Sequence, residues 1–153
     1  MKIALRLLAE HPFFKDLDES LLKLIAPLAT SERFEDGEYI LREGQDANEF
    51  YLIQAGQVAL EIYTPGRGVL TVETIGAGET LGWSWMIPPH QWRFDAKAVG
   101  LTRTMMIDGK RLRALCEENH SLKNEILIRV TQLIAHRLHA TRSQLMGTHA
   151  THA

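Results

Sequence analysis

The chain has 153 residues, of which 45% are hydrophobic and 24% charged, a balance that suits one globular domain with a single core. Its formal net charge of −2 gives no general attraction for nucleic acid or for an anionic membrane. One cysteine, Cys116, cannot form a disulfide framework or hold an iron–sulfur cluster, and the N-terminus carries neither a signal peptide nor a membrane-spanning run. We therefore expect a cytoplasmic protein.

Residues 1–30 are predicted to be helical. Leu5, Leu8 and Ala9 share one face of a first segment. Asp18 is placed to cap a second segment that is rich in leucine. The sequence thus predicts short amphipathic helices before any strand.

Residues 31–108 have the pattern of short strands separated by glycine. The β-rich pieces are EYILRE, EFYLIQAG, QVALEIYT, VLTVETIG and LTRTMMID. Pro65, Gly66 and Gly68 supply the turn chemistry for a hairpin between two of them. Many short strands with turns between them predict an all-β roll or barrel.

Helical spacing returns over residues 109–146, with Asp108 as the expected cap of a short helix and Ser121 as the cap of a long one. The apolar stripe of the long helix comprises Leu122, Ile126, Leu127, Val130, Leu133, Ile134, Leu138 and Leu145. A helix over 121–146 is about 39 Å long, more than one small roll covers. Residues 147–153 are expected to form a frayed tail.

We expect part of this stripe to pair with a second copy of the chain, as in a two-stranded coiled coil. The alternative is a helix packed entirely on its own domain. The expected dimer contacts are Ile126, Val130, Leu133, Ile134, Arg137 and Leu138.

The order of these elements and several local motifs resemble the cyclic-nucleotide-binding domain of CRP/FNR-type regulators, kinase regulatory subunits and gated channels. The matching features are Gly37, the Glu43–Gly44 pair, the aromatic-rich strand 50–53, and Gly56, Gly78 and Gly82. The resemblance covers nearly the whole chain. It implies one mainly β domain with flanking helices over residues 1–153: a β-roll (a jelly-roll-like double-stranded β-helix) with a long C-terminal dimerisation helix.

The family's phosphate-binding cassette begins with Gly-Glu and later reaches Pro-Arg. The glutamate binds the ribose hydroxyl and the arginine binds the cyclic phosphate. A gap-free match from Gly82 to Ala98 puts Trp83 at the glutamate and Trp92 at the arginine. Ordinary binding of cAMP or cGMP is therefore expected to be lost. If Trp92 faces the pocket, strand alternation turns Arg93 away from it, unless a bulge reverses the two.

The resemblance makes Gly82, Trp83, Ser84, Trp92 and Arg93 the candidate ligand-binding residues. Indoles beside a pocket favour a flat apolar effector, with Arg93 available for a carboxylate. Two alternatives stay open: a ligand-free scaffold whose aromatic residues close the pocket, and cAMP or cGMP binding retained through Arg93. No cofactor or metal is expected, with haem on His90 as the remaining alternative.

An enzyme is not expected. No histidine lies between His11 and His90, so the roll lacks the histidine cluster of a cupin metalloenzyme. The long helix is followed by no helix-turn-helix segment, so DNA binding is not expected, and the signal would pass through the dimer helix to a partner protein.

Overall fold

The N-terminal helices are confirmed. The computed structural model describes the backbone of residues 2–152 and the side chains of residues 4–143 and Met146. It begins with α1 (Lys2–Glu10), η1 (Pro12–Phe14), α2 (Glu19–Ile25) and η2 (Ala26–Leu28). Asp18 caps α2, because its carboxylate accepts a hydrogen bond from the Ser20 N–H at 3.3 Å.

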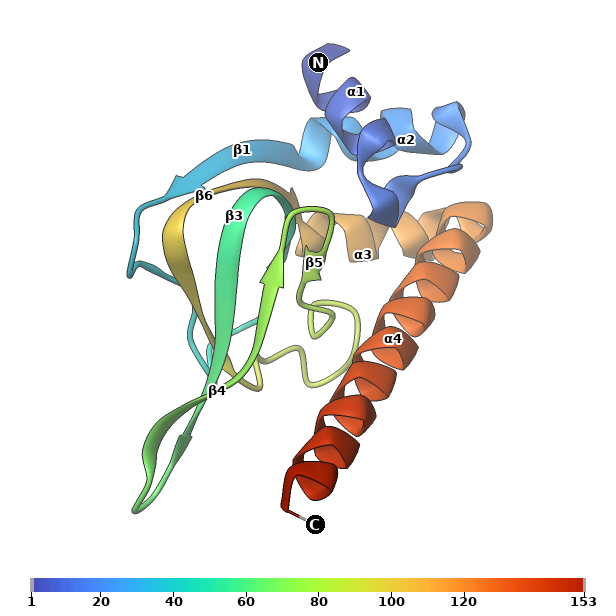
Figure 1. The fold of residues 1–153 in the computed structure, drawn as a ribbon. Helices are drawn as coiled ribbons and strands as arrows, with labels where there is room; N and C mark the ends of the chain where they lie inside the picture. The colour runs from blue at the N-terminus through green and yellow to red at the C-terminus, as the bar shows by residue number, and fades with distance from the viewer. Residues whose placement is uncertain (1, 153) are drawn as a thin grey trace.

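Six strands form the roll: β1 (Ala29–Phe34), β2 (Tyr39–Leu41), β3 (Glu49–Thr64), β4 (Gly68–Gly76), β5 (Thr80–Leu81) and β6 (Asp95–Asp108). The strand order is β1-β6-β3-β4, with β2 on β6 and β5 on β3, and the pairs are antiparallel. The strands curl together beside the helices (Figure 1). The mainly β fold with flanking helices is therefore confirmed.

The segments expected as two strands, EFYLIQAG and QVALEIYT, form the single long strand β3. Its pairing with β6 shifts between Ile53 and Gln57, where the strand bends. Gly56 stands at this bend with φ +94°, and a Cβ there would lie 2.5 Å from the Leu101 carbonyl oxygen. Only glycine fits this corner. The expected hairpin follows, with Thr64 paired to Gly68.

The C-terminal helices are α3 (Gly109–Glu118) and α4 (His120–His152). Asp108 caps α3 as expected, accepting from the Arg111 N–H at 3.0 Å. The cap of α4 is Asn119 rather than Ser121, because the Asn119 side-chain oxygen accepts from the Leu122 N–H at 3.0 Å. Helix α4 runs beyond the predicted end at Met146, and the side chains of the predicted tail lie outside the described residues.

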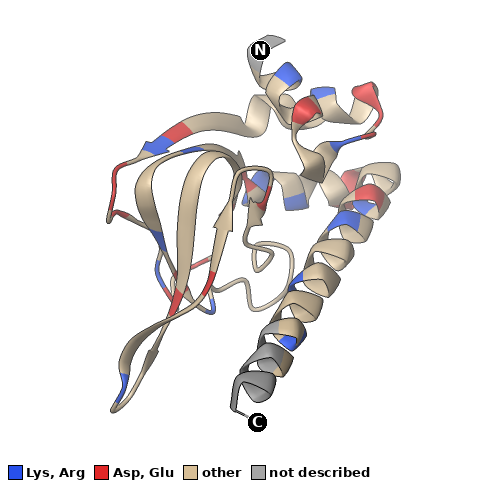
Figure 2. Cartoon of the chain, in the orientation of Figure 1, with Lys and Arg blue, Asp and Glu red and all other residues tan. Residues whose placement is uncertain are grey.

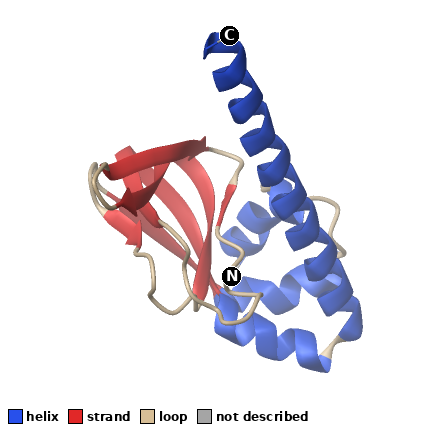
Figure 3. Ribbon diagram, turned by 90° about the horizontal axis from the view of Figure 1, so that it is seen from below, coloured by secondary structure: helices blue, strands red, loops and turns tan. Residues whose placement is uncertain are grey.

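The apolar stripe of α4 has two parts with different surroundings. Leu122, Ile126 and Val130 are at most 3% exposed and belong to the chain's own core, whereas Leu138 is 70% exposed. Figure 3 shows the C-terminal turns of α4 extending beyond the strands. Of the predicted dimer contacts, Ile126 and Val130 are therefore not available to a second copy, whereas Leu138 is. Leu145 lies outside the described side chains.

Charges of both signs are spread over the helices and the sheet, in keeping with the small net charge (Figure 2).

Burial raises the pKa of the Cys116 thiol to about 11, so this cysteine stays protonated at neutral pH. Among the residues that the structure describes, no helix is long and apolar enough to cross a membrane.

His11 joins the N-terminal helices to the roll as a buried, neutral side chain. Its Nδ1 accepts a hydrogen bond from the Phe13 N–H at 3.2 Å, which caps η1. Burial lowers the pKa of His11 below its ordinary value of 6.5, and the neighbouring backbone of Ile53 and Glu79 offsets this only in part. A proton on Nδ1 would also remove the acceptor for the Phe13 N–H.

The low pKa of His11 predicts that acid destabilises the fold. The unfolded chain binds this proton more readily, so the free energy of unfolding falls as pH drops through and below 6.5. His11→Asn keeps a capping acceptor and cannot titrate, so its stability should fall less. Urea unfolding at about pH 7.5 and pH 5.5 measures the difference. Equal losses in both proteins would show that His11 is not the group responsible.

Candidate functional site

The candidate site is built on the loop between β5 and β6, and this loop is fastened at its far end by backbone hydrogen bonds. The Gly44 N–H donates to the Trp92 carbonyl at 2.9 Å, and the Trp92 N–H donates to the Gln45 carbonyl at 3.0 Å. Arg113 of α3 donates to the carbonyls of Ala47 and Trp85, so one side chain ties the loop to the C-terminal helices. These contacts fix the backbone of the loop up to Trp92, directly before Arg93.

Trp92 lies in the core against the backbone of Gly82. Its side chain is 2% exposed, and a Cβ on Gly82 would lie 2.4 Å from the ring atom Cζ3. Gly82 also has φ +96°, which disfavours other residues. Gly82 therefore makes room for the indole and does not line the cavities described below.

Trp85 is likewise a core residue. It is fully buried and stacks on Phe50 with ring centroids 4.5 Å apart and an interplanar angle of 11°. The burial of Trp85 and Trp92 is in keeping with the alternative in which the aromatic residues close the pocket.

Trp83 and Arg93 line two adjoining cavities together with Ser84. One cavity has a volume of about 180 Å³ and is also lined by Leu60, Val72, Glu73, Phe94, Arg137 and Thr141. The other has a volume of about 220 Å³ and is also lined by Ile87, Pro88, Pro89 and Gln91. Trp83 is half-buried and Arg93 is exposed, so a flat apolar surface and a cation face the same space.

The sequence left the orientation of two residues open. In the structure, Trp92 and Arg93 point to opposite sides: Trp92 faces the core and Arg93 faces the cavities. The reason is the space above Gly82, which accepts the indole on the core side.

Glu73 reaches the smaller cavity because of a β-bulge. The pairing of β3 with β4 shifts between Leu60↔Glu73 and Glu61↔Thr71, which leaves Val72 as the extra residue. Neighbours on a regular strand face opposite sides, yet Val72 and Glu73 both line this cavity. Hydrophobic alternation does not reveal a bulge, so no sequence pattern pointed to Glu73.

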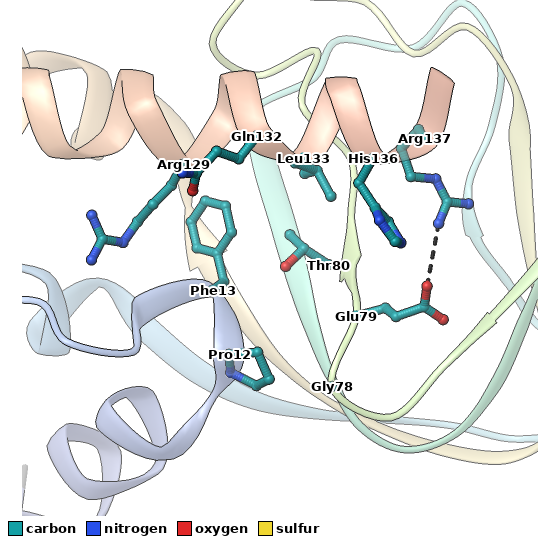
Figure 4. A pocket seen from close by; sticks show the side chains of 10 residues that line it. All are labelled: Pro12, Phe13, Gly78, Glu79, Thr80, Arg129, Gln132, Leu133, His136 and Arg137. Carbon is teal, nitrogen blue, oxygen red and sulfur yellow. Dashed lines mark hydrogen bonds and ion pairs between the residues drawn. The ribbon is translucent and has the colours of Figure 1, made fainter. Parts of the chain in front are cut away.

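Arg137 lines the smaller cavity and is buried. Its side chain is 8% exposed, forms an ion pair with Glu73, and donates from Nη1 to Glu79 at 3.3 Å. On its far side lies a third cavity of about 290 Å³, between η1, β5 and α4 (Figure 4). The position of Arg137 within the apolar stripe of α4 was the sequence signal that this charged side chain could be buried.

In the described part of the chain, no three His, Cys, Asp or Glu side chains lie close enough together to hold a metal ion. His90 is half-buried in the loop beside Pro89. The absence of a cofactor stays a prediction, with haem on His90 as the alternative.

Comparison with known proteins decides the family. The sequence profile described as "Cyclic nucleotide-binding domain" matches residues 31–119, from β1 to just past the end of α3. The chain belongs to the cyclic nucleotide-binding domain family. The match includes the roll and the loop that carries Trp83 and Arg93, so the candidate site lies inside the family's domain. The chain is thus a regulatory module of this type.

Relatives of this cyclic nucleotide-binding domain include channels and regulators. "Cyclic nucleotide-gated ion channel 1" of Arabidopsis thaliana is 30% identical over 128 residues, and the "Anaerobic regulatory protein" of Bacillus subtilis is 26% identical over 122 residues. These matches cover 80% and 78% of this chain but only 16% and 51% of the relatives. The crystal structure of a candidate cyclic nucleotide-binding protein from Geobacter metallireducens is similar with a TM-score of 0.79 and 28% identity, over 90% of this chain and 99% of that one.

Gly82→Ala should destabilise the domain because the added methyl group meets the Trp92 ring in a backbone conformation that disfavours alanine. Overpacking of a core typically costs about 1–3 kcal/mol, and the positive φ adds about 1 kcal/mol. Gly66→Ala is the matched control, since Gly66 has φ +85° but no atom within 4 Å of its Cβ position. Urea unfolding of both variants measures the difference, and equal losses would mean that the Trp92 contact is unimportant.

Proposed function

We propose that this protein is a sensor that binds a small anionic ligand with a flat apolar part, and not cAMP or cGMP, beside Trp83 and Arg93. The observation that carries the proposal is that these two side chains line the same two cavities with Ser84.

The chemistry of the lining supports an anion attached to an apolar body. An arginine forms charge-assisted, often bidentate hydrogen bonds with a carboxylate. A half-buried indole offers a face on which an aromatic ring can stack. The buried Ser84 hydroxyl adds a donor or acceptor that can orient the ligand.

The size of the cavities and the residue at position 83 argue against a cyclic nucleotide. Volumes of about 180 and 220 Å³ lie below the roughly 300–1,000 Å³ of typical ligand pockets. Trp83 also stands where the family resemblance places the ribose-binding glutamate. A ligand more compact than a nucleotide fits both observations.

Two alternatives have specific support. The burial of Trp85 and Trp92 favours a ligand-free scaffold. The orientation of Arg93 favours retained cAMP or cGMP binding, because a cation suited to a phosphate does face the cavities.

Isothermal titration with indole-3-acetate, cAMP and cGMP separates these functions. We expect saturable binding of indole-3-acetate and no heat from either nucleotide. Arg93→Gln should weaken indole-3-acetate binding about tenfold or more, because it removes a charge-assisted hydrogen bond. Arg67→Gln, in the exposed turn between β3 and β4, should leave it unchanged.

Each other outcome selects a different function. Saturable cAMP or cGMP binding by the wild-type protein would restore the nucleotide sensor, and no binding of any probe would favour the scaffold. Trp83→Glu restores the family's ribose-binding residue, so we expect this variant to bind cAMP more strongly than the wild type does.

We further propose that the distal part of α4 pairs with a second copy and passes the signal to a partner protein. The support is the exposure of Leu138 and Met146, at 70% and 62%. Burying such side chains between two helices is favourable.

Leu138→Glu should convert a dimer into a monomer, because the carboxylate would be buried against the partner helix. Leu127→Glu, at a position of α4 that is 41% exposed beside the roll, should stay dimeric. Sedimentation equilibrium measures both, and a monomeric wild-type protein would contradict dimerisation through α4.

A further inference from the structure

Arg137 is a buried guanidinium that contacts two carboxylates, Glu73 through Nη2 and Glu79 through Nη1. Glu73, on β4, lines the cavity that also contains Trp83 and Arg93. Glu79, which follows β4, lines the cavity between η1 and α4 (Figure 4). Arg137 lines both cavities, whereas Glu73 lines only the first of these two and Glu79 only the second.

The two carboxylates are held differently. Glu79 accepts a hydrogen bond from the Gly76 N–H at 2.7 Å in addition to its bond with Arg137. Among the described hydrogen bonds and ion pairs, Glu73 takes part only in the ion pair with Arg137. This ion pair is made by Nη2 of Arg137. Glu79 is therefore held by two contacts, and the Glu73 carboxylate by one.

The charges that line the smaller cavity explain why Glu73 is there. Two arginines, Arg93 and Arg137, and one acid, Glu73, face this space. A guanidinium that is 8% exposed needs a counterion, because burying a charge without compensation costs several kcal/mol. Glu73 supplies this charge when the cavity holds no anion.

We propose that Glu73 is a built-in competitor that an anionic ligand displaces from Arg137. This inference rests on the proposed function, and it assigns Arg137 as a second anion-binding residue opposite Arg93. The incoming anion takes the place of Glu73 at Nη2, while Glu79 keeps Arg137 in place. The ligand would then bridge the loop that carries Arg93 and helix α4, and a neutral analogue could not displace the carboxylate.

Inorganic sulfate tests whether an anion displaces Glu73 from Arg137, independently of any organic part of a ligand. Thermal unfolding of the wild type, Glu73→Gln and Glu79→Gln is followed in sodium sulfate and in sodium chloride of equal ionic strength. We expect sulfate to raise the melting temperature of Glu73→Gln more than that of the wild type, because the competitor is gone. Glu79→Gln should gain no such extra stabilisation, since Glu73 remains on the arginine.

The comparison of Glu73→Gln with Glu79→Gln makes the sulfate-induced shift of the melting temperature specific to Glu73. Both variants remove one negative charge from the same guanidinium, and in both the remaining carboxylate compensates Arg137, so both are expected to fold. A general effect of charge or of sulfate would appear equally in the two. Equal sulfate-induced shifts in all three proteins would overturn the proposal.

Titration with indole-3-acetate then separates this inference from the proposed function. Glu73→Gln should bind about tenfold more tightly than the wild type, as expected for removing one competing charge. Binding by the wild type with no gain in Glu73→Gln would overturn the competitor and leave the proposed function standing. A sulfate effect confined to Glu73→Gln, with no organic anion bound by either protein, would support the competitor and overturn the proposed ligand class.

Discussion

The contact of a buried indole with a glycine backbone organises the candidate site. Because Gly82 has no side chain, the Trp92 ring fills the core beside it, and the following residue is turned outward to the cavities. The hydrogen bonds of Trp92 with Gly44 and Gln45 hold the backbone in this position. The location of Arg93, and with it the electrostatics of the site, depends on this one packing arrangement.

The sequence predicted the features that local chemistry determines. Asp18 and Asp108 cap the helices as expected, and the glycines that the family resemblance singled out have positive φ. The choice of Asn119 over Ser121 was missed because both residue types cap helices and they stand two positions apart. The orientation of Trp92 and Arg93 was left open and the bulge at Val72 was missed, because each depends on space or pairing between distant segments.

Helix α4 is attached to the domain by two different kinds of contact. Its first turns bury Leu122, Ile126 and Val130, an attachment that depends on apolar area and responds little to ions. Further along, Arg137 joins the helix to the roll through charges. The middle of the helix is therefore the place where the contents of a neighbouring cavity can alter how firmly the helix is held.

The three tryptophans of the chain lie within ten residues of one another but in unlike surroundings. Trp85 and Trp92 are at most 2% exposed, whereas Trp83 is half-buried at the cavities. A water-soluble quencher such as acrylamide should therefore reach one indole and spare the other two. The accessible part of the emission comes from the residue that would touch a ligand, so the protein carries a native optical reporter of its own site.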